Sequence, residues 1–322
     1  MTGDFRFRWR GKTIHIPAML LIALAGLLAL LLAACSSTPD APPTATSALV
    51  TAPTTAPTSR ATAPPGTAMP PLGSSGLAVF AASSLKDAFT EAGQQFREDN
   101  PLVTDLQFNF QGSQLLVTQL QQGAPAGVFA SADKANMDKA VQAGVIDGEP
   151  SELARNVLTV VLPNDNPANI QTLADLARPG VKISLADPSV PVGAYSEQAL
   201  DKLAADPVYG ADFKQKVLDN VVSREDNVRQ VLTRVQLDQV DAGIVYTTDA
   251  LAANAASSGS VQPVKTMEIP SQYNIVAVYY IAQVKGAPHP AAARTWIMYI
   301  LSSGGQAVLA KYGFVTAESN TP

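Results

Sequence analysis

The sequence has few of the residues that many functional sites require. Its 322 residues include one cysteine, two histidines, 6% aromatic residues and 15% charged residues. A single cysteine, Cys35, excludes a disulfide framework and any multi-cysteine metal or iron–sulfur site. His15 and His289 are too few for a multi-histidine zinc site and for most histidine-based acid–base catalysis. Binding or catalysis therefore has to rest on other groups.

Positive charge is scarce in the greater part of the chain. Four of the 22 basic residues and one of the 27 acidic residues lie before Ser36, so the remainder carries a formal charge of −8. Nucleic acids require a basic face, which excludes them as partners. A field of this sign repels anions, so a bound anion would have to be held by local geometry.

The first 35 residues predict an export signal. A basic start precedes an unbroken apolar run at 18–34, which is the pattern of a signal peptide. The run ends in Leu-Ala-Ala-Cys, which resembles the bacterial lipobox, whose cysteine (here Cys35) is lipidated and becomes the mature N-terminus. The alternative is an uncleaved transmembrane anchor, for which the run is slightly short. Both interpretations leave the rest of the chain outside the cell and tied to a membrane.

Residues 36–75 predict a disordered linker. Nine prolines and nine threonines fall within these 40 residues. Such a segment has too little apolar surface to offset the entropy of ordering, so a semi-rigid tether is expected. Recognition of its prolines by a partner is the alternative.

From Gly76 onward, strand patterns alternate with helix patterns. Apolar runs such as 77–82, 128–130, 157–162 and 273–282 are typical of strands, and helical spacing follows several of them. This alternation predicts an α/β fold with largely parallel sheets flanked by helices, and about 247 residues are enough for two lobes. The chain is expected to cross between the lobes near Val157 and near Ser271. The predicted domains are a lipoprotein signal peptide (1–35), a linker (36–75), lobe I (76–157), lobe II (158–270) and a return segment with the second part of lobe I (271–322).

Two matching turns at strand ends indicate an anion site in lobe I. Ser83 and Ser84 follow the first strand, and Gly112 and Ser113 follow the second. Ligands of open α/β sheets bind beyond the carboxyl ends of strands, where hydroxyls and backbone N–H groups at helix starts can hold an anion. The structural alternative is that these serines only cap helices, and Ser84 with Asp87 is an N-cap signature.

Lobe II offers three further candidates. The N–H of Val192 precedes a helix predicted at about 194–203, and the N–H of Val228 lies at the start of another at 227–238. Tyr246 ends a short strand, and its hydroxyl is a third donor. Ordinary packing roles explain all three equally well, and no spacing rule selects them.

Seven ordered segments resemble the molybdate-binding proteins of bacterial ABC importers. They are VFAASSL at 79–85, FQGSQL at 110–115, GAPAGVFASAD at 123–133, DPSVPVG at 187–193, EDNVR at 225–229, GIVY at 243–246 and KYGF at 311–314. The resemblance extends over about 77–314. The sequence departs from the family at Gly127, where Asp is usual, and at Val192, where Ala is frequent; the first puts a local turn in doubt, and the second changes little because the donor is backbone.

The resemblance implies a two-lobed, periplasmic-binding-protein-like fold of type II, with the ligand in the interlobe cleft. It implies that Ser84, Ser113 and Tyr246 donate hydrogen bonds through their hydroxyls, and Val192 and Val228 through their backbone N–H groups. No cofactor and no metal cation are implied, because molybdenum is bound as molybdate, or tungsten as tungstate. The implied partner is an ABC transporter permease in the membrane, and the protein is expected to be a monomeric, extracytoplasmic, membrane-anchored lipoprotein.

Two alternatives remain open at this point. A binding protein of the same fold for sulfate or another small anion would use similar donors. A serine acyl hydrolase is suggested by Ser83-x-x-Lys86, which fits the S-x-x-K pattern. That pattern needs S-D-N and K-T-G partners; the first is missing, and Lys265-Thr266-Met267 does not complete the second. A binding protein is therefore expected rather than an enzyme.

Overall fold

The chain divides into two units, Met1–Thr67 and Ala68–Pro322. The computed structural model describes residues 6–9, 12–15, 76–255 and 262–316. In the first unit, β1 (Arg6–Trp9) and β2 (Lys12–His15) pair antiparallel, which the sequence did not predict. The rest of the predicted signal peptide and linker, including Cys35, lies outside the described residues. Among the residues described, no helix is both long and apolar enough to cross a membrane.

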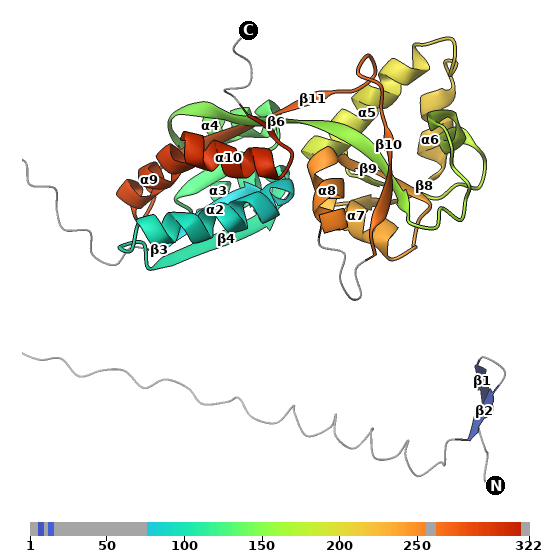
Figure 1. The fold of residues 1–322 in the computed structure, drawn as a ribbon, viewed down its shortest axis with the longest axis horizontal. Coiled ribbons are helices and arrows are strands. Elements are labelled where there is room, and N and C mark those ends of the chain that lie inside the picture. Colours follow the sequence, from blue (N-terminus) through green and yellow to red (C-terminus); the bar gives the residue numbers. More distant parts are fainter. Residues whose placement is uncertain (1–5, 10–11, 16–75, 256–261, 317–322) are drawn as a thin grey trace, which may run out of the picture. The chain divides into compact units, whose positions relative to one another are not determined.

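In the second unit, ten strands within the described residues form one sheet that serves two lobes (Figure 1). Their order is β4-β3-β5-β11-β6-β9-β7-β8, and β10 and β12 also pair with β6. Lobe I contains β3 (Gly76–Ala82), β4 (Asp105–Gln111), β5 (Val128–Ser131), β11 (Val276–Val284) and β12 (Val315–Thr316). Lobe II contains β7 (Ile183–Ala186), β8 (Val221–Glu225), β9 (Ala242–Tyr246) and β10 (Val264–Glu268).

The long strand β6 (Ile146–Pro163) belongs to both lobes. It pairs with β11 as far as Val157, and with β9 from Leu158 onward. The sequence predicted a strand only at 157–162, because the polar residues before it do not form an apolar run. Pairing with β11 holds that first half in the sheet, and β11 itself begins at Val276, three residues later than predicted.

The predicted α/β fold is confirmed, but the pairing is mixed and not largely parallel as predicted. β3 lies parallel between β4 and β5, and β7 lies parallel between β8 and β9. The strands that pass between the lobes, β6 and β11, are antiparallel to the neighbours they meet. Each lobe thus has a parallel triplet whose carboxyl ends share one edge of the sheet, and that edge positions the functional turns.

Helices cover both lobes. Lobe I has η1 (Ser83–Leu85), α2 (Lys86–Asp99), α3 (Ser113–Gln121), α4 (Lys134–Gln142), α9 (Pro290–Leu301) and α10 (Ser303–Lys311). Lobe II has η2 (Leu173–Ala177), α5 (Pro191–Ala204), α6 (Phe213–Asp219), α7 (Val228–Gln236) and α8 (Thr247–Ala255).

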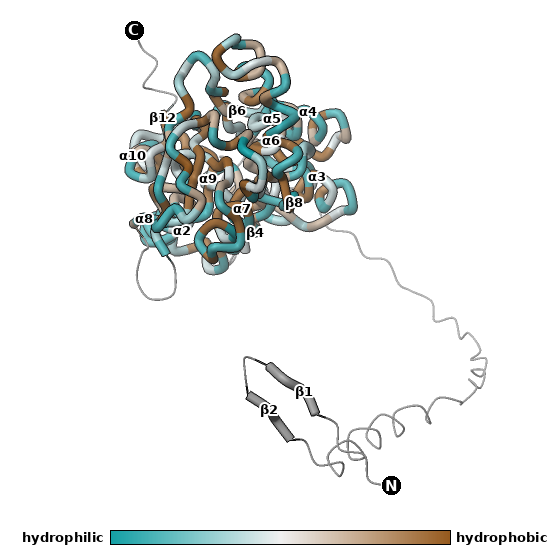
Figure 2. Tube along the Cα trace, turned by 90° about the vertical axis from the view of Figure 1, so that its right-hand side faces the viewer, coloured by the Kyte–Doolittle hydropathy of each residue, from teal (hydrophilic) through white to brown (hydrophobic). Residues whose placement is uncertain are grey.

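Apolar side chains fill the interior of the second unit, where Figure 2 shows many of the brown, hydrophobic stretches. In lobe I, Trp296 of α9 is fully buried and meets Phe89 and Phe96 of α2 edge-on, with ring centroids 5.5 and 5.1 Å apart. Edge-to-face aromatic pairs add about 0.5–1.5 kcal/mol each beyond their buried area. These contacts fix α2, and with it the turn at Ser84, against the sheet.

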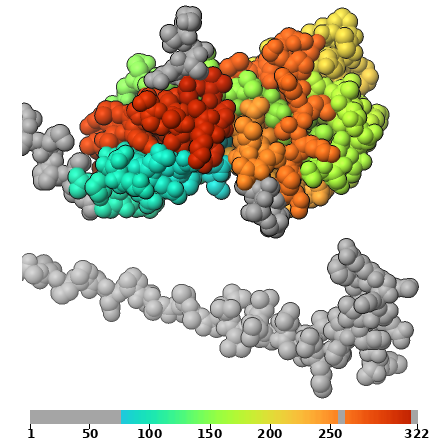
Figure 3. Space-filling view, in the orientation of Figure 1, coloured from blue at the N-terminus to red at the C-terminus, as the bar shows by residue number. Residues whose placement is uncertain are grey.

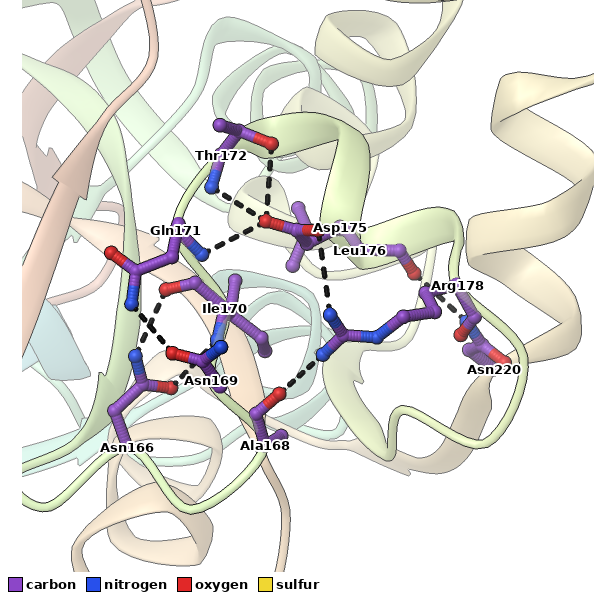
Figure 4. A network of polar contacts seen from close by, with 10 residues as sticks. All are labelled: Asn166, Ala168, Asn169, Ile170, Gln171, Thr172, Asp175, Leu176, Arg178 and Asn220. Carbon is purple, nitrogen blue, oxygen red and sulfur yellow. Dashed lines mark hydrogen bonds and ion pairs between the residues drawn. The ribbon is translucent and has the colours of Figure 1, made fainter.

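A polar network orders the irregular connection between β6 and β7 (Figure 4). Asp175 Oδ2 accepts from the backbone N–H of Thr172 at 2.8 Å and so caps η2. The Asn166 side chain exchanges two hydrogen bonds with the backbone of Ile170, at 2.9 and 3.0 Å, and Arg178 donates to the carbonyl of Ala168. Lobe II therefore keeps a defined shape without regular structure in this segment.

Candidate functional site

Neither of the two predicted serines of lobe I caps a helix through its side chain. Ser84 lies in the short helix η1, which runs directly into α2, so the predicted N-cap at Ser84 is wrong. Its Oγ instead lies 2.9 Å from the hydroxyl of Tyr279. Ser113 is the first residue of α3, and its Oγ accepts a hydrogen bond from the N–H of Ala132 at 3.1 Å. Since a backbone N–H can only donate, the Ser113 hydroxyl keeps its own proton for another acceptor.

The two valines of lobe II lie in the first turns of helices. α5 begins at Pro191, about three residues earlier than predicted, because proline suits the first helical position. Val192 is therefore the second residue of α5, and Val228 is the first residue of α7, whose N-cap Asn227 accepts from the N–H of Gln230 at 3.2 Å. The first N–H groups of a helix have no acceptor within it, and they attract negative charge.

Tyr246 is the last residue of β9 and is 1% exposed. Its hydroxyl has no hydrogen-bond partner among the described residues. Burial raises the pKa of this phenol well above its usual value, so the group stays protonated. A buried hydroxyl without a partner is unfavourable by about 1–3 kcal/mol, which a bound acceptor would relieve.

The structure brings these five predicted residues together around one small cavity of ≈ 10 Å³. Since about 10–15 Å³ of such space is needed to hold one water molecule, the cavity suits a single small ion. The described residues that line it are all uncharged: Ala82, Ser83, Ser84, Gln111, Gly112, Ser113, Ala132, Val190, Pro191, Val192, Val228 and Tyr246.

The two lobes are closed over this cavity, and Figure 3 shows them in contact. Gln114 of lobe I donates from Nε2 to the carbonyl of Asp226 in lobe II at 2.9 Å. Arg229 Nη2 of lobe II lies 2.6 Å from Asp87 Oδ2 of lobe I. Gly112 is required at this junction, because a Cβ there would lie 2.3 Å from the Asp226 carbonyl oxygen.

A buried ion pair lies behind the cavity and outside its lining. Arg229 Nε is 2.7 Å from Asp249 Oδ1, although the two groups are not aligned as a hydrogen bond. Asp249 is fully buried. Burial raises the pKa of its carboxyl to about 6, against the opposing charge of Arg229. Arg229 thus links Asp249 within lobe II to Asp87 across the cleft.

Sequence reasoning missed Tyr279, Asp87, Arg229 and Asp249. Two of them carried a usable signal: a tyrosine in a buried strand and an aspartate in an apolar helix both require polar partners. The pattern could not say which partners those are. The departure from the family at Gly127 put the local turn in doubt. The backbone of Gly127 is nevertheless hydrogen-bonded to that of Ala78 and Val284, at 2.8 and 2.9 Å.

A larger hollow lies where β6, α8 and β10 meet. Its side chains Thr159, Thr247 and Asn274 already hydrogen-bond to protein groups. The acidic side chain of Glu268 also lines it, and a negative charge there repels an anion.

Comparison with known proteins identifies the family. Residues 77–315 match the family of bacterial extracellular solute-binding proteins. The chain belongs to this family. Its members bind solutes and are not enzymes, which removes the hydrolase alternative and agrees with an extracytoplasmic location.

Individual relatives narrow the comparison. The molybdate-binding protein ModA of Mycobacterium tuberculosis is 38% identical over 245 residues, which are 76% of this chain and 86% of that protein. The periplasmic molybdate-binding protein of Azotobacter vinelandii has a TM-score of 0.62 at 21% identity, covering 74% of this chain and 98% of that one. The sulfate-binding protein SubI of M. tuberculosis has a TM-score of 0.66 at 20% identity, covering 76% and 87%. The two structural likenesses confirm the periplasmic-binding-protein fold.

Proposed function

We propose that this solute-binding protein captures molybdate or tungstate and delivers it to an ABC importer. The oxyanion would lie in the small cavity between the lobes, held by Ser84, Ser113 and Tyr246 and by the backbone N–H groups of Val192 and Val228. The relatives named molybdate-binding support this choice of ligand.

The observation that carries the proposal is a small cavity with an uncharged lining that offers hydrogen-bond donors. Molybdate and tungstate are proton-free dianions at neutral pH, so every oxygen accepts hydrogen bonds and none donates. Hydrogen phosphate carries a proton that needs an acceptor such as a carboxylate. No carboxylate is among the described residues that line the cavity, and the Tyr246 hydroxyl has no partner there until an acceptor enters.

Five such donors are sufficient for useful affinity. A hydrogen bond to a charged group contributes about 1.5–3 kcal/mol, so five would supply roughly 8–15 kcal/mol before desolvation and lobe closure are subtracted. A micromolar dissociation constant requires about 8 kcal/mol. The acidic surface is therefore no obstacle, because no lysine or arginine has to enter the site.

The remaining features of the proposal concern delivery. Lipidation of Cys35 would anchor a monomer to the outer face of a membrane, the 36–75 segment would act as its tether, and closure of lobe I (76–157 and 271–322) on lobe II (158–270) would present the loaded form to the permease. The apolar run before Cys35 and the proline-rich composition after it support this arrangement.

Thermal-shift measurements and calorimetry on the purified chain test the proposed ligand. At 100–1,000 times the dissociation constant, molybdate and tungstate should each stabilise the protein by about 2.7–4.1 kcal/mol. Phosphate should not, because it carries a proton, and sulfate should stabilise the protein less, because its shorter bonds to oxygen fit the cavity less well. Stabilisation by sulfate alone would establish the sulfate alternative, and stabilisation by none of the four would refute the proposal.

Serine substitutions test the site itself. Ser113→Ala should weaken molybdate binding by about 1.5–3 kcal/mol, and so should Ser84→Ala. Ser223→Ala is the matched control, because Ser223 donates to Ser184 at 3.1 Å in the β7–β8 pair and does not line the cavity. Wild-type affinity in both test variants would remove these serines from the site.

A further inference from the structure

Tyr279 lies directly behind Ser84, outside the lining of the cavity. It is on β11 and is fully buried, and its hydroxyl is 2.9 Å from Ser84 Oγ. Its ring packs edge-on against Phe314 and Tyr246, with centroids 5.4 and 5.8 Å away. The tyrosine is therefore fixed in place, and only the direction of its hydrogen bond to Ser84 is open.

That direction decides what Ser84 offers to a ligand. Each hydroxyl has one proton and can accept through its lone pairs. If Tyr279 donates to Ser84, the Ser84 proton is left for the cavity. If Ser84 donates to Tyr279, only lone pairs face the cavity, and they repel an anion.

The side chain of Asn156 determines the direction. Its Oδ1 accepts from the N–H of Val157 at 3.0 Å, and a backbone N–H can only donate, so the amide orientation is fixed. Thr247 Oγ1 also donates to Oδ1, at 3.0 Å. The Nδ2 group consequently faces the other way and donates to Thr248 Oγ1 at 2.8 Å. Its second hydrogen is available to the Tyr279 hydroxyl, with which the Asn156 side chain interacts.

The acid–base behaviour of Tyr279 agrees with this assignment. Burial raises the pKa of its phenol, the charge of Asp249 raises it further, and hydrogen-bond contacts with Ser84 and Asn156 oppose the rise. A phenol that accepts from Asn156 has to place its own proton elsewhere, because a buried unpaired hydroxyl proton is unfavourable. Ser84 Oγ is the acceptor within reach.

We propose that Tyr279 is a positioning residue that donates to Ser84, under the control of Asn156, and thereby makes Ser84 a donor toward the anion. This inference rests on the proposed oxyanion site. The arrangement parallels Ser113, whose acceptor side is occupied by the N–H of Ala132. Both serines then offer a proton to the cavity, which suits an anion whose oxygens carry only lone pairs.

The consequence is selection by protonation state. With Tyr279→Phe, the Ser84 hydroxyl is free to rotate and to accept as well as donate. Affinity for molybdate should fall about three- to tenfold, while affinity for hydrogen phosphate should not fall. The dissociation constant for hydrogen phosphate divided by that for molybdate should therefore fall by about the same factor. Tyr299→Phe is the matched control, since it removes a tyrosine hydroxyl bonded to Gln95 at 3.2 Å, away from the cavity.

A double-mutant cycle separates positioning from a general structural role. If Tyr279 acts through Ser84, Tyr279→Phe should have no further effect on molybdate affinity in a Ser84→Ala background. Equal losses in both backgrounds, or an unchanged ratio of molybdate to phosphate affinity, would overturn the inference. Failure of the wild-type chain to bind molybdate would instead refute the proposed function.

A second variant tests the same series of hydrogen bonds, from Asn156 through Tyr279 to Ser84, if Tyr279→Phe does not fold. In Asn156→Asp a carboxylate accepts the Tyr279 proton, so Tyr279 would accept from Ser84 and turn the Ser84 proton away from the cavity. The added charge alone also weakens anion binding, but it does not change how much the Ser84 hydroxyl contributes to molybdate affinity. Ser84→Ala should therefore reduce molybdate affinity less in the Asn156→Asp background than in wild type. An equal reduction in both backgrounds would contradict the proposed direction.

Discussion

Asp87→Asn should weaken ligand binding by opening the closed form, although Asp87 does not touch the cavity. Asp87 lies on α2 of lobe I and Arg229 on α7 of lobe II, with 2.6 Å between Asp87 Oδ2 and Arg229 Nη2. Two unit charges about 4 Å apart attract by about 4 kcal/mol at an effective dielectric constant of about 20. The Asp87 side chain is 36% exposed and that of Arg229 22%, so solvent screening reduces the net effect to about 1–2 kcal/mol. Because the anion binds the closed form, its affinity should fall about five- to thirtyfold.

Calorimetry with molybdate at low and high salt measures this effect. The asparagine keeps the shape and one acceptor of Asp87, and Arg229 keeps Asp249, so the fold should remain intact. The loss should shrink at high salt, because the pair is partly exposed and screened. Asp138→Asn is the control, since the Lys134–Asp138 pair, at 2.7 Å, lies within α4. Equal affinities for the two variants at low salt would refute the interlobe role of Asp87.

Three further predictions concern the cavity and its surroundings. Tyr246→Phe should weaken molybdate binding by about tenfold or more without lowering the free energy of unfolding of the ligand-free protein, because it removes a buried hydroxyl that has no partner among the described residues. Calorimetric titration and urea unfolding measure the two quantities, and a fall in both would contradict the prediction. Gly112→Ala should hinder closure against the Asp226 carbonyl and reduce affinity, yet leave the melting temperature of the ligand-free protein within a few degrees of wild type. Because the pKa of Asp249 is raised from 3.8 to about 6, its contribution to stability is complete only below about pH 3.8 and is lost as the pH rises through about 6. The free energy of unfolding of wild type relative to that of Asp249→Asn should thus decline by up to about 3 kcal/mol between pH 3 and pH 7, and a difference that grows with pH would have the wrong sign.

Ser84 and Ser113 could be predicted from local signals, whereas Val192, Val228 and Tyr246 were selected by the family resemblance, because no spacing rule singles them out. Ser84, Ser113, Val192, Val228 and Tyr246 each lie at a strand end or helix start, which apolar runs and turn residues mark within a few positions. Parallel pairing then brings those ends to one edge of each sheet, and the five residues meet at one cavity. Their roles toward a ligand remain proposals, as do the lobe boundaries.

The contacts that organise those donors were beyond local patterns. The Ser84–Tyr279 bond joins residues 195 positions apart, and the Arg229–Asp87 bond joins residues 142 apart. Nothing in the spacing of a sequence pairs such residues, because the register of the sheet and the closure of the lobes bring them together. The first half of β6 was missed for the same reason, since its partner strand β11 lies more than 100 residues later.

An acidic protein can bind a dianion because hydroxyl and amide protons, rather than charged side chains, face the ligand. A lysine in the cavity would attract hydrogen phosphate as readily as molybdate, because both are dianions and Coulomb attraction depends on charge. Hydroxyls that already accept from a protein donor distinguish a proton-free oxygen from a protonated one: Ser113 accepts from the Ala132 N–H, and Ser84 accepts from Tyr279 under the assignment above. Tyr246 adds a proton with no acceptor among the described residues. Such a site attracts an oxygen that has only lone pairs and repels one that carries a hydrogen. The uncharged lining therefore itself selects proton-free anions over protonated ones.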